Sequence, residues 1–271
     1  MITDNLIYTG MYLSERGEKM GETILTTNKL CKTFSNEGVQ QHVLRNLDIS
    51  FEKGDFTVIM GASGAGKSTL LYALSGMDKP TLGDIYYGNT KISGYSNDKL
   101  AVFRRRHCGF VFQQIYLLEN MSVLDNVMAV GLLADKNKKE VSGRGKELLK
   151  QVGLDKNSWK KFPSQLSGGE AQRVGIVRAL INKPEIVFAD EPTGALNSAH
   201  GKAVLDTFTN CHQEGQSIIL VTHDLRSALR GNRIIYLKDG IICGECRLTD
   251  YDEDDQNRIG ILRDFLEEMG W

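Results

Sequence analysis

The stretch FTVIMGASGAGKST, residues 56–69, decides how the rest of the chain is interpreted. The run FTVIM predicts a buried strand, and three glycines then surround Lys67 before leucines recur at helical spacing. Residues 61–69 are therefore predicted to form a glycine-rich loop between a strand and a helix.

This loop fits the pattern GxxxxGK[ST] through Gly61, Gly66, Lys67 and Ser68. Glycines let the backbone curl so that N–H groups point inward, and a helix N-terminus adds positive potential, which suits phosphate oxygens. Lys67 can reach β- and γ-phosphates, and the Ser68 hydroxyl is a ligand for Mg²⁺. A chance glycine turn is disfavoured by the strand before it and the helix after it. The expected phosphate-binding residues are Gly61, Ala62, Ser63, Gly64, Ala65, Gly66, Lys67, Ser68 and Thr69.

A loop that binds a nucleoside triphosphate needs a carboxylate at the end of a neighbouring parallel strand to help hold magnesium. The segment IVFADE, residues 186–191, supplies one. We expect Asp190 to hold the metal, directly or through water, and Glu191 to orient and deprotonate an attacking water. The structural alternative is that this pair caps the turn before Pro192.

The segment LSGGE, residues 166–170, opens a second helix with serine and glycines, and it is again suited to an anion. One monomer needs only one phosphate loop. The interpretation we favour is a head-to-tail pair, in which Ser167, Gly168 and Gly169 close over the γ-phosphate held by the partner's loop.

The order of patterns predicts an α/β fold, a P-loop nucleotide hydrolase with a mostly parallel sheet at its core. An N-terminal antiparallel β subdomain precedes that sheet, and a helical subdomain is inserted at about 115–175. We expect an extension over 1–22, an ATP-binding domain over 23–250 and an amphipathic C-terminal helix over 251–271. The apolar face of that helix is predicted to dock on its own domain rather than on a partner, and its residues are Ile259, Leu262, Phe265, Leu266 and Met269.

The ordered motifs GASGAGKST, FVFQQ, LSGGEAQRV, IVFADEPTGAL and VTHD make residues 23–245 resemble the ATP-binding cassette (ABC) family. The resemblance implies ATP and Mg²⁺ as cofactors and ATP hydrolysis as the activity. It implies that Gln113 touches magnesium or the attacking water and faces a membrane partner. It also implies that His223 contacts the γ-phosphate and that Phe34 stacks on adenine, where the family usually has tyrosine.

FRRRHCGFVFQQIYLLENMSVLDNV and ADEPTGAL further resemble lipoprotein-release, macrolide-export and bacitracin-resistance cassettes, which pair with a separate membrane permease. One departure is Asn197, where the family usually has aspartate; coupling or turnover can change while Glu191 still supports hydrolysis. The expected function is therefore the energising subunit of a permease, acting as a dimer of cassettes at the cytoplasmic face of the membrane. Mechanical signalling with no translocated substrate is the alternative. A DNA-repair or translation ATPase is disfavoured because long coiled-coil arms and a second cassette are lacking.

Composition narrows the partners further. The chain has 33 basic and 34 acidic residues, so a general attraction to nucleic acid is missing, and the arginines of 104–106 are interpreted as a solvated or partner-facing surface. The apolar runs are strand-sized, no secretory signal is recognised, and the five cysteines suit a reducing compartment. Cys243 and Cys246 form a lone CxxC without a second pair, which disfavours zinc or redox use.

Overall fold

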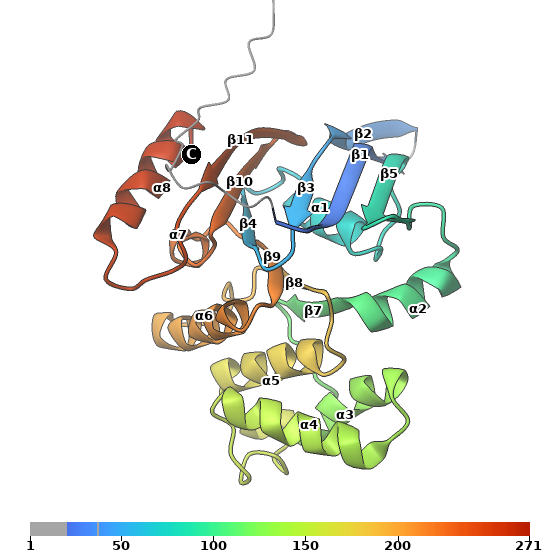
Figure 1. Cartoon of the computed structure of the whole chain (residues 1–271), viewed down its shortest axis with the longest axis vertical. Coiled ribbons are helices and arrows are strands. Elements are labelled where there is room, and N and C mark those ends of the chain that lie inside the picture. The colour runs from blue at the N-terminus through green and yellow to red at the C-terminus, as the bar shows by residue number, and fades with distance from the viewer. Residues whose placement is uncertain (1–20, 37) are drawn as a thin grey trace, which may run out of the picture.

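The computed structural model describes residues 21–36 and 38–271, so the extension expected over 1–22 lies, except for its last two residues, outside the described residues. Two sheets organise this part of the chain (Figure 1). The antiparallel sheet has the order β2-β1-β5-β6, with β3 paired to β1. Its strands are β1 (Thr23–Asn36), β2 (Val39–Leu47), β3 (Ser50–Glu52), β5 (Leu82–Tyr87) and β6 (Thr90–Lys91).

The core sheet has the order β11-β10-β4-β9-β8-β7, and every neighbouring pair in it is parallel except β10 with β11. Its strands are β4 (Phe56–Met60), β7 (Cys108–Phe112), β8 (Ile186–Asp190), β9 (Ser217–Val221), β10 (Arg233–Lys238) and β11 (Ile241–Arg247). The predicted α/β class with an antiparallel N-terminal sheet and a mostly parallel core is confirmed.

Two apolar layers enclose the core sheet because side chains alternate between its faces. In β4, Ile59 packs toward α1, α2 and the antiparallel sheet, whereas Phe56, Val58 and Met60 pack toward α5, α6 and α8. The helices of these layers are α1 (Lys67–Leu74), α2 (Asn97–His107), α5 (Gly168–Leu180), α6 (Ser198–Gln213), α7 (Leu225–Ala228) and α8 (Gln256–Glu268). The α1 and α5 helices thus cover opposite faces of the sheet.

A helical region lies between β7 and β8, at the end of the molecule away from the antiparallel sheet (Figure 1). It contains α3 (Val123–Ala134), α4 (Lys138–Gln151) and α5, which share a third apolar cluster. Ser122 caps α3, because its hydroxyl accepts the Asp125 N–H at 3.2 Å. The last helix ends at Leu180, five residues beyond the expected limit of 175.

The C-terminal helix α8 packs on its own core through Leu262 and Leu266, which are fully buried. Arg258, only 2% exposed, donates from its guanidinium to the carbonyls of Leu229, Thr249 and Gly231. Ile259 departs from the expected apolar face, because it is 38% exposed. Among the described helices, none has the length and apolar character needed to span a membrane.

A candidate nucleotide site at the carboxyl ends of the core strands

The glycine-rich loop turns between β4 and α1 with backbone angles that glycine adopts readily. Gly64 and Gly66 have φ of +82° and +100°, and a Cβ on Gly61 would stand 2.1 Å from the carbonyl oxygen of Leu237. The turn between β10 and β11 also supports the loop, since the Gly240 N–H donates to the Ala65 carbonyl at 3.2 Å. The loop is therefore fixed against the strands behind it, as a phosphate cradle requires.

Lys67 lies inside this loop and is only 8% exposed. Its Nζ donates to the carbonyls of Gly61 and Ala62 at 2.8 and 2.9 Å. Burial lowers the pKa of Lys67, and the nearby carboxylates of Glu191 and Asp190 oppose this effect. An ammonium has three N–H donors, so two bonds within the loop leave one for an anion at its centre.

Asp190 ends β8 beside Phe112 of β7 and Val221 of β9, so the segments that follow these three strands meet at one edge of the sheet. Both of its carboxylate oxygens accept bonds from α1. Ser68 Oγ donates to Oδ1 at 2.9 Å, and Tyr72 Oη donates to Oδ2 at 2.6 Å. Burial and the bond to Asp190 raise the pKa of Tyr72, so its hydroxyl stays protonated and donates.

Glu191 has a φ of +45°, which is uncommon for a side chain of its size and is typical of strained functional positions. Its carboxylate accepts a bond from Thr222 Oγ1 at 2.9 Å and lies 2.8 Å from His223 Nδ1. The turn of residues 191–194, which contains Pro192, is closed by a backbone bond from the Gly194 N–H to the Glu191 carbonyl. The carboxylates therefore do not cap that turn, which was the alternative left open by the sequence.

Gln113 follows β7 directly, and its Nε2 lies 2.9 Å from the place where a Cβ on Gly194 would stand. The loop that carries Gln113 is attached to α5: Gln172 donates to the Phe112 carbonyl at 2.9 Å, and Arg178 donates to the Tyr116 carbonyl at 2.6 Å. The structure thus brings Gln113, Glu191 and His223 to the same edge as the phosphate loop.

The segment of residues 166–170 lies at the start of α5, the helix on the face of the core sheet opposite α1. Ser167 and Glu170 form a capping box at the start of α5, with bonds of 3.2 and 2.8 Å. Within the described part of the chain, the amides of Gly168 and Gly169 are left without an acceptor. In the described structure no hydrogen bond joins residues 166–170 to the phosphate loop, and α1 and α5 cover opposite faces of the core sheet.

Phe34 lies on β1, paired with Gln41 of β2 and two pair positions along the ladder from Leu44, which borders Gly66. Its ring is 45% exposed and carries the Lys32 ammonium over one face at 4.9 Å. An exposed aromatic ring near the loop keeps surface available for stacking. Asn197 caps α6 by accepting the His200 N–H at 2.9 Å, so the amide retains the shape of the aspartate it replaces.

Sequence reasoning missed Tyr72 and Thr222, two of the three hydroxyls that hold the carboxylates; the third is Ser68. The signal for Tyr72 was present, because a residue four positions after Ser68 shares its helix face. Thr222 lies next to His223 in VTHD, but only the fold shows that its hydroxyl turns to Glu191.

Residues 44–194 match the family profile described as ABC transporter. The chain belongs to the ABC transporter family of ATP-binding cassettes. It is an ABC-type ATP hydrolase, as the fold and the order of its motifs indicate. It is 40% identical over 224 residues to the lipoprotein-releasing system ATP-binding protein LolD of Idiomarina loihiensis, covering 82% of this chain and 98% of that protein.

The cassette is also similar to a second sequence relative and to a solved structure. Over 219 residues the cassette is 42% identical to the macrolide export ATP-binding/permease protein MacB of Mannheimia succiniciproducens, covering 81% of this chain and 34% of that protein. Among solved structures, it resembles the dimeric structure of MJ0796, a bacterial ABC transporter cassette, with a TM-score of 0.77 and 38% identity. That match covers 84% of this chain and 100% of the other.

Proposed function

We propose that two copies of this cassette close around two ATP–Mg²⁺ units and thereby power a separate membrane permease from the cytoplasmic face. The observation that carries this proposal is the division of the site. The phosphate loop is joined to Asp190 through Ser68 of α1, which covers one face of the core sheet. The amides of Gly168 and Gly169, which have no acceptor in the described structure, begin α5 on the opposite face of that sheet. A second copy placed head to tail supplies the missing helix end to each phosphate loop.

In this proposal Ser68, Asp190 and Gln113 hold magnesium, either directly or through water. Their oxygens are the hard ligands that Mg²⁺ prefers, and no basic side chain in the described structure lies within ion-pair distance of Asp190. When bound, the ion neutralises charge on the β- and γ-phosphate oxygens. The oxygen donors and a carboxylate with no ion-pair partner among the described residues both fit such an ion.

Glu191 is the proposed base that takes a proton from the attacking water. Thr222 and His223 hold its carboxylate, and its positive φ is typical of a functional position. His223 is 69% exposed at its side chain, so its free face can contact a γ-phosphate in the closed dimer. Lys67 binds the β- and γ-phosphates, and Phe34 stacks on adenine.

The permease is proposed to contact the surface formed by α2, the loop of 113–122 and α3. Five of the fourteen exposed large apolar side chains among the described residues lie on this surface. They are Val102, Tyr116, Leu118, Met121 and Leu133, with exposed fractions of 39 to 65%. Because Gln113 begins this loop, movement of the permease and the state of the site are linked through one short segment.

The relatives named for lipoprotein release and macrolide export favour an export or extraction system, and antimicrobial peptide resistance belongs to the same proposed class. The signalling alternative predicts the same dimer but a different partner. Pull-down of the tagged cassette from detergent-solubilised membranes of its source cells, followed by identification of the bound subunit, separates these two.

The dimer itself is tested with Glu191→Gln, which retains the site but lacks the base. Light scattering after size exclusion is expected to find a dimer with ATP and Mg²⁺ and a monomer in EDTA. A Ser167→Arg substitution added to this variant is expected to keep it monomeric. A Glu191→Gln protein that binds ATP and Mg²⁺ yet remains a monomer would contradict the proposal.

A further inference from the structure

One face of α1 holds both oxygens of the Asp190 carboxylate. Ser68 and Tyr72 are four residues apart, so their side chains project from the same side of the helix, one turn from each other. Ser68 donates to Oδ1 at 2.9 Å and Tyr72 donates to Oδ2 at 2.6 Å. The carboxylate therefore cannot rotate without breaking a bond to a helix that also carries Lys67.

The bond from Tyr72 is short, as is usual when a hydroxyl donates to an ionised carboxylate. Asp190 is the one hydrogen-bond acceptor that the described structure gives to the Tyr72 hydroxyl. The ring packs at the edge of the apolar cluster beneath the antiparallel sheet, a place that phenylalanine would fill equally well. Packing thus explains the ring, while the hydroxyl has Asp190 as its partner.

We propose that Tyr72 is a positioning residue for Asp190: by holding Oδ2, it keeps Oδ1 turned toward Ser68 and the metal position. This inference rests on the proposed function, in which Ser68 and Asp190 hold magnesium. Groups that orient a metal-holding carboxylate commonly change metal affinity by about 10- to 100-fold when removed. The part assigned to Tyr72 is orientation, so it does not touch the nucleotide or the reacting atoms.

The test compares nucleotide affinity with and without metal in the full chain. A fluorescent ATP analogue is titrated in Mg²⁺ and in EDTA. The ratio of the two dissociation constants gives the metal gain, which is the increase in nucleotide affinity that Mg²⁺ produces. We expect Tyr72→Phe to reduce this gain about tenfold and to leave the affinity in EDTA unchanged. The measurement needs no hydrolysis, so it does not depend on turnover.

Tyr87→Phe is the matched control. Tyr87 also donates to α1, at the Leu74 carbonyl and 3.0 Å, but it does not touch Asp190. We expect Tyr87→Phe to lower stability and to retain the full metal gain. In an Asp190→Asn background, adding Tyr72→Phe should produce no further loss, because the carboxylate it orients is gone.

The outcomes separate the inference from the function on which it rests. If the parent shows no nucleotide binding or no metal gain, the proposed function fails and this inference fails with it. If the parent shows the gain and Tyr72→Phe retains it, the positioning role alone is rejected. An equal loss in Tyr87→Phe would also reject it, since general support of α1 would then explain the result.

Discussion

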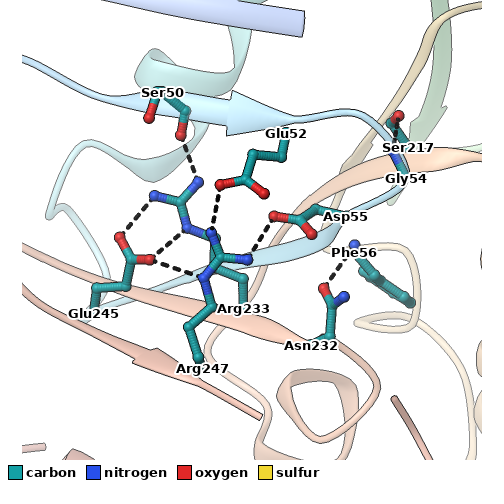
Figure 2. A network of polar contacts seen from close by, with 10 residues as sticks. All are labelled: Ser50, Glu52, Gly54, Asp55, Phe56, Ser217, Asn232, Arg233, Glu245 and Arg247. Carbon is teal, nitrogen blue, oxygen red and sulfur yellow. Dashed lines mark hydrogen bonds and ion pairs between the residues drawn. The ribbon is translucent and has the colours of Figure 1, made fainter. Parts of the chain in front are cut away.

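The core sheet has one polar cluster at the amino ends of its parallel strands and another at their carboxyl ends. The two clusters differ in the groups that bind their carboxylates. At the amino ends of the strands, Arg233 forms a bidentate pair with Glu245 at 2.8 and 2.7 Å (Figure 2). Arg247 reaches Asp55 at 2.9 Å and Glu52 at 3.2 Å (Figure 2). Every carboxylate of this cluster therefore has a guanidinium partner.

At the carboxyl ends, Asp190 and Glu191 receive hydroxyl and imidazole groups instead. Burial lowers the pKa of Lys67 and these two carboxylates are close enough to oppose that effect, but its Nζ is bonded to loop carbonyls. Within the described residues no guanidinium pairs with Asp190 or Glu191, so a cation bound from outside the chain can supply positive charge there.

The two clusters differ in whether arginine side chains of the same chain pair with the carboxylates. The paired cluster joins β3 of the antiparallel sheet to β10 and β11 of the core sheet, so it contributes to architecture. Even in this cluster the ion pair offsets the effect of burial only in part. The pKa of Asp55 is raised because burial outweighs the opposing effect of Arg247. The Asp190–Glu191 cluster has no guanidinium partner among the described residues, which agrees with its proposed use for a metal ion and an attacking water.

The largest effect is expected at Glu191. Glu191→Gln removes the proposed base, and loss of a general base lowers turnover by about 10²- to 10⁴-fold. ATP should still bind, because the phosphate loop is unchanged. The control is Glu185→Gln, which removes a carboxylate beside β8 at its other end, where it pairs with His107 at 2.8 Å. Steady-state ATPase turnover of Glu191→Gln within threefold of the parent would remove Glu191 from the role of base.

The second effect concerns nucleotide affinity. Lys67→Ala takes away the proposed phosphate-binding ammonium, and a charge-assisted bond of about 1.5 to 3 kcal/mol corresponds to roughly 10- to 100-fold in affinity. The titration uses a fluorescent ATP analogue in Mg²⁺. Lys91→Ala removes an equal charge on the exposed β5–β6 hairpin and should leave the affinity within about twofold of the parent. Unchanged affinity in Lys67→Ala would contradict the assigned loop.

The third effect is on folding. Arg233 is 5% exposed, and replacing it with methionine leaves Glu245 without its bidentate partner. We expect about 2 kcal/mol of lost stability, below the range for fully buried pairs because Glu245 is partly exposed. Denaturant unfolding measures this, and nucleotide affinity per folded molecule should not change.

Arg247→Met is the control for that variant, because Arg247 is 44% exposed at its side chain. Pairs that solvent reaches contribute about 0 to 1 kcal/mol each. Equal losses in the two variants would show that burial does not set the strength of this network.

The contrast also separates what the sequence predicts from what it leaves open. Loop, strand and helix around Lys67 could be predicted because glycine positions and apolar periodicity are local signals. Asp190 and Glu191 could be predicted because parallel strands end at one edge of a sheet. The sequence did not assign the Tyr72 hydroxyl to Asp190 or the Thr222 hydroxyl to Glu191. Which side chains meet at the carboxyl ends of the strands depends on the register of the sheet.

The paired cluster was not predicted at all. Asp55 and Arg247 are 192 positions apart in the chain, and each alone resembles an ordinary surface charge. The arginines of 104–106 were interpreted as a solvated or partner-facing surface. They lie in the last turn of α2, where positive charge complements the helix dipole, and Arg104 also donates to the Gly76 carbonyl at 2.6 Å.

The smallest effect is expected at Glu170, whose carboxylate accepts a backbone N–H at the start of α5 and lies 4.0 Å from Lys161 Nζ. The Ser167 N–H that Glu170 accepts at 2.8 Å lowers the pKa of Glu170, with Lys161 and Arg173 adding to the effect. A depressed folded pKa means that the charge stabilises the protein above the unfolded pKa, about 4.3, and that this contribution is lost as pH falls through the folded value.

Glu170→Gln keeps an acceptor for Ser167 N–H but removes the charge at the start of α5, so about 0.5 kcal/mol should be lost at pH 7. Denaturant unfolding of parent and variant should give a constant difference from pH 8 to 6 that shrinks below about pH 5. Glu268→Gln, at the exposed end of α8, removes a carboxylate from the unfavourable end of a helix and should stabilise slightly or not at all. If both variants lose stability equally and at all pH values, the helix end at Ser167 does not distinguish charge, and its proposed use for a phosphate loses its electrostatic basis.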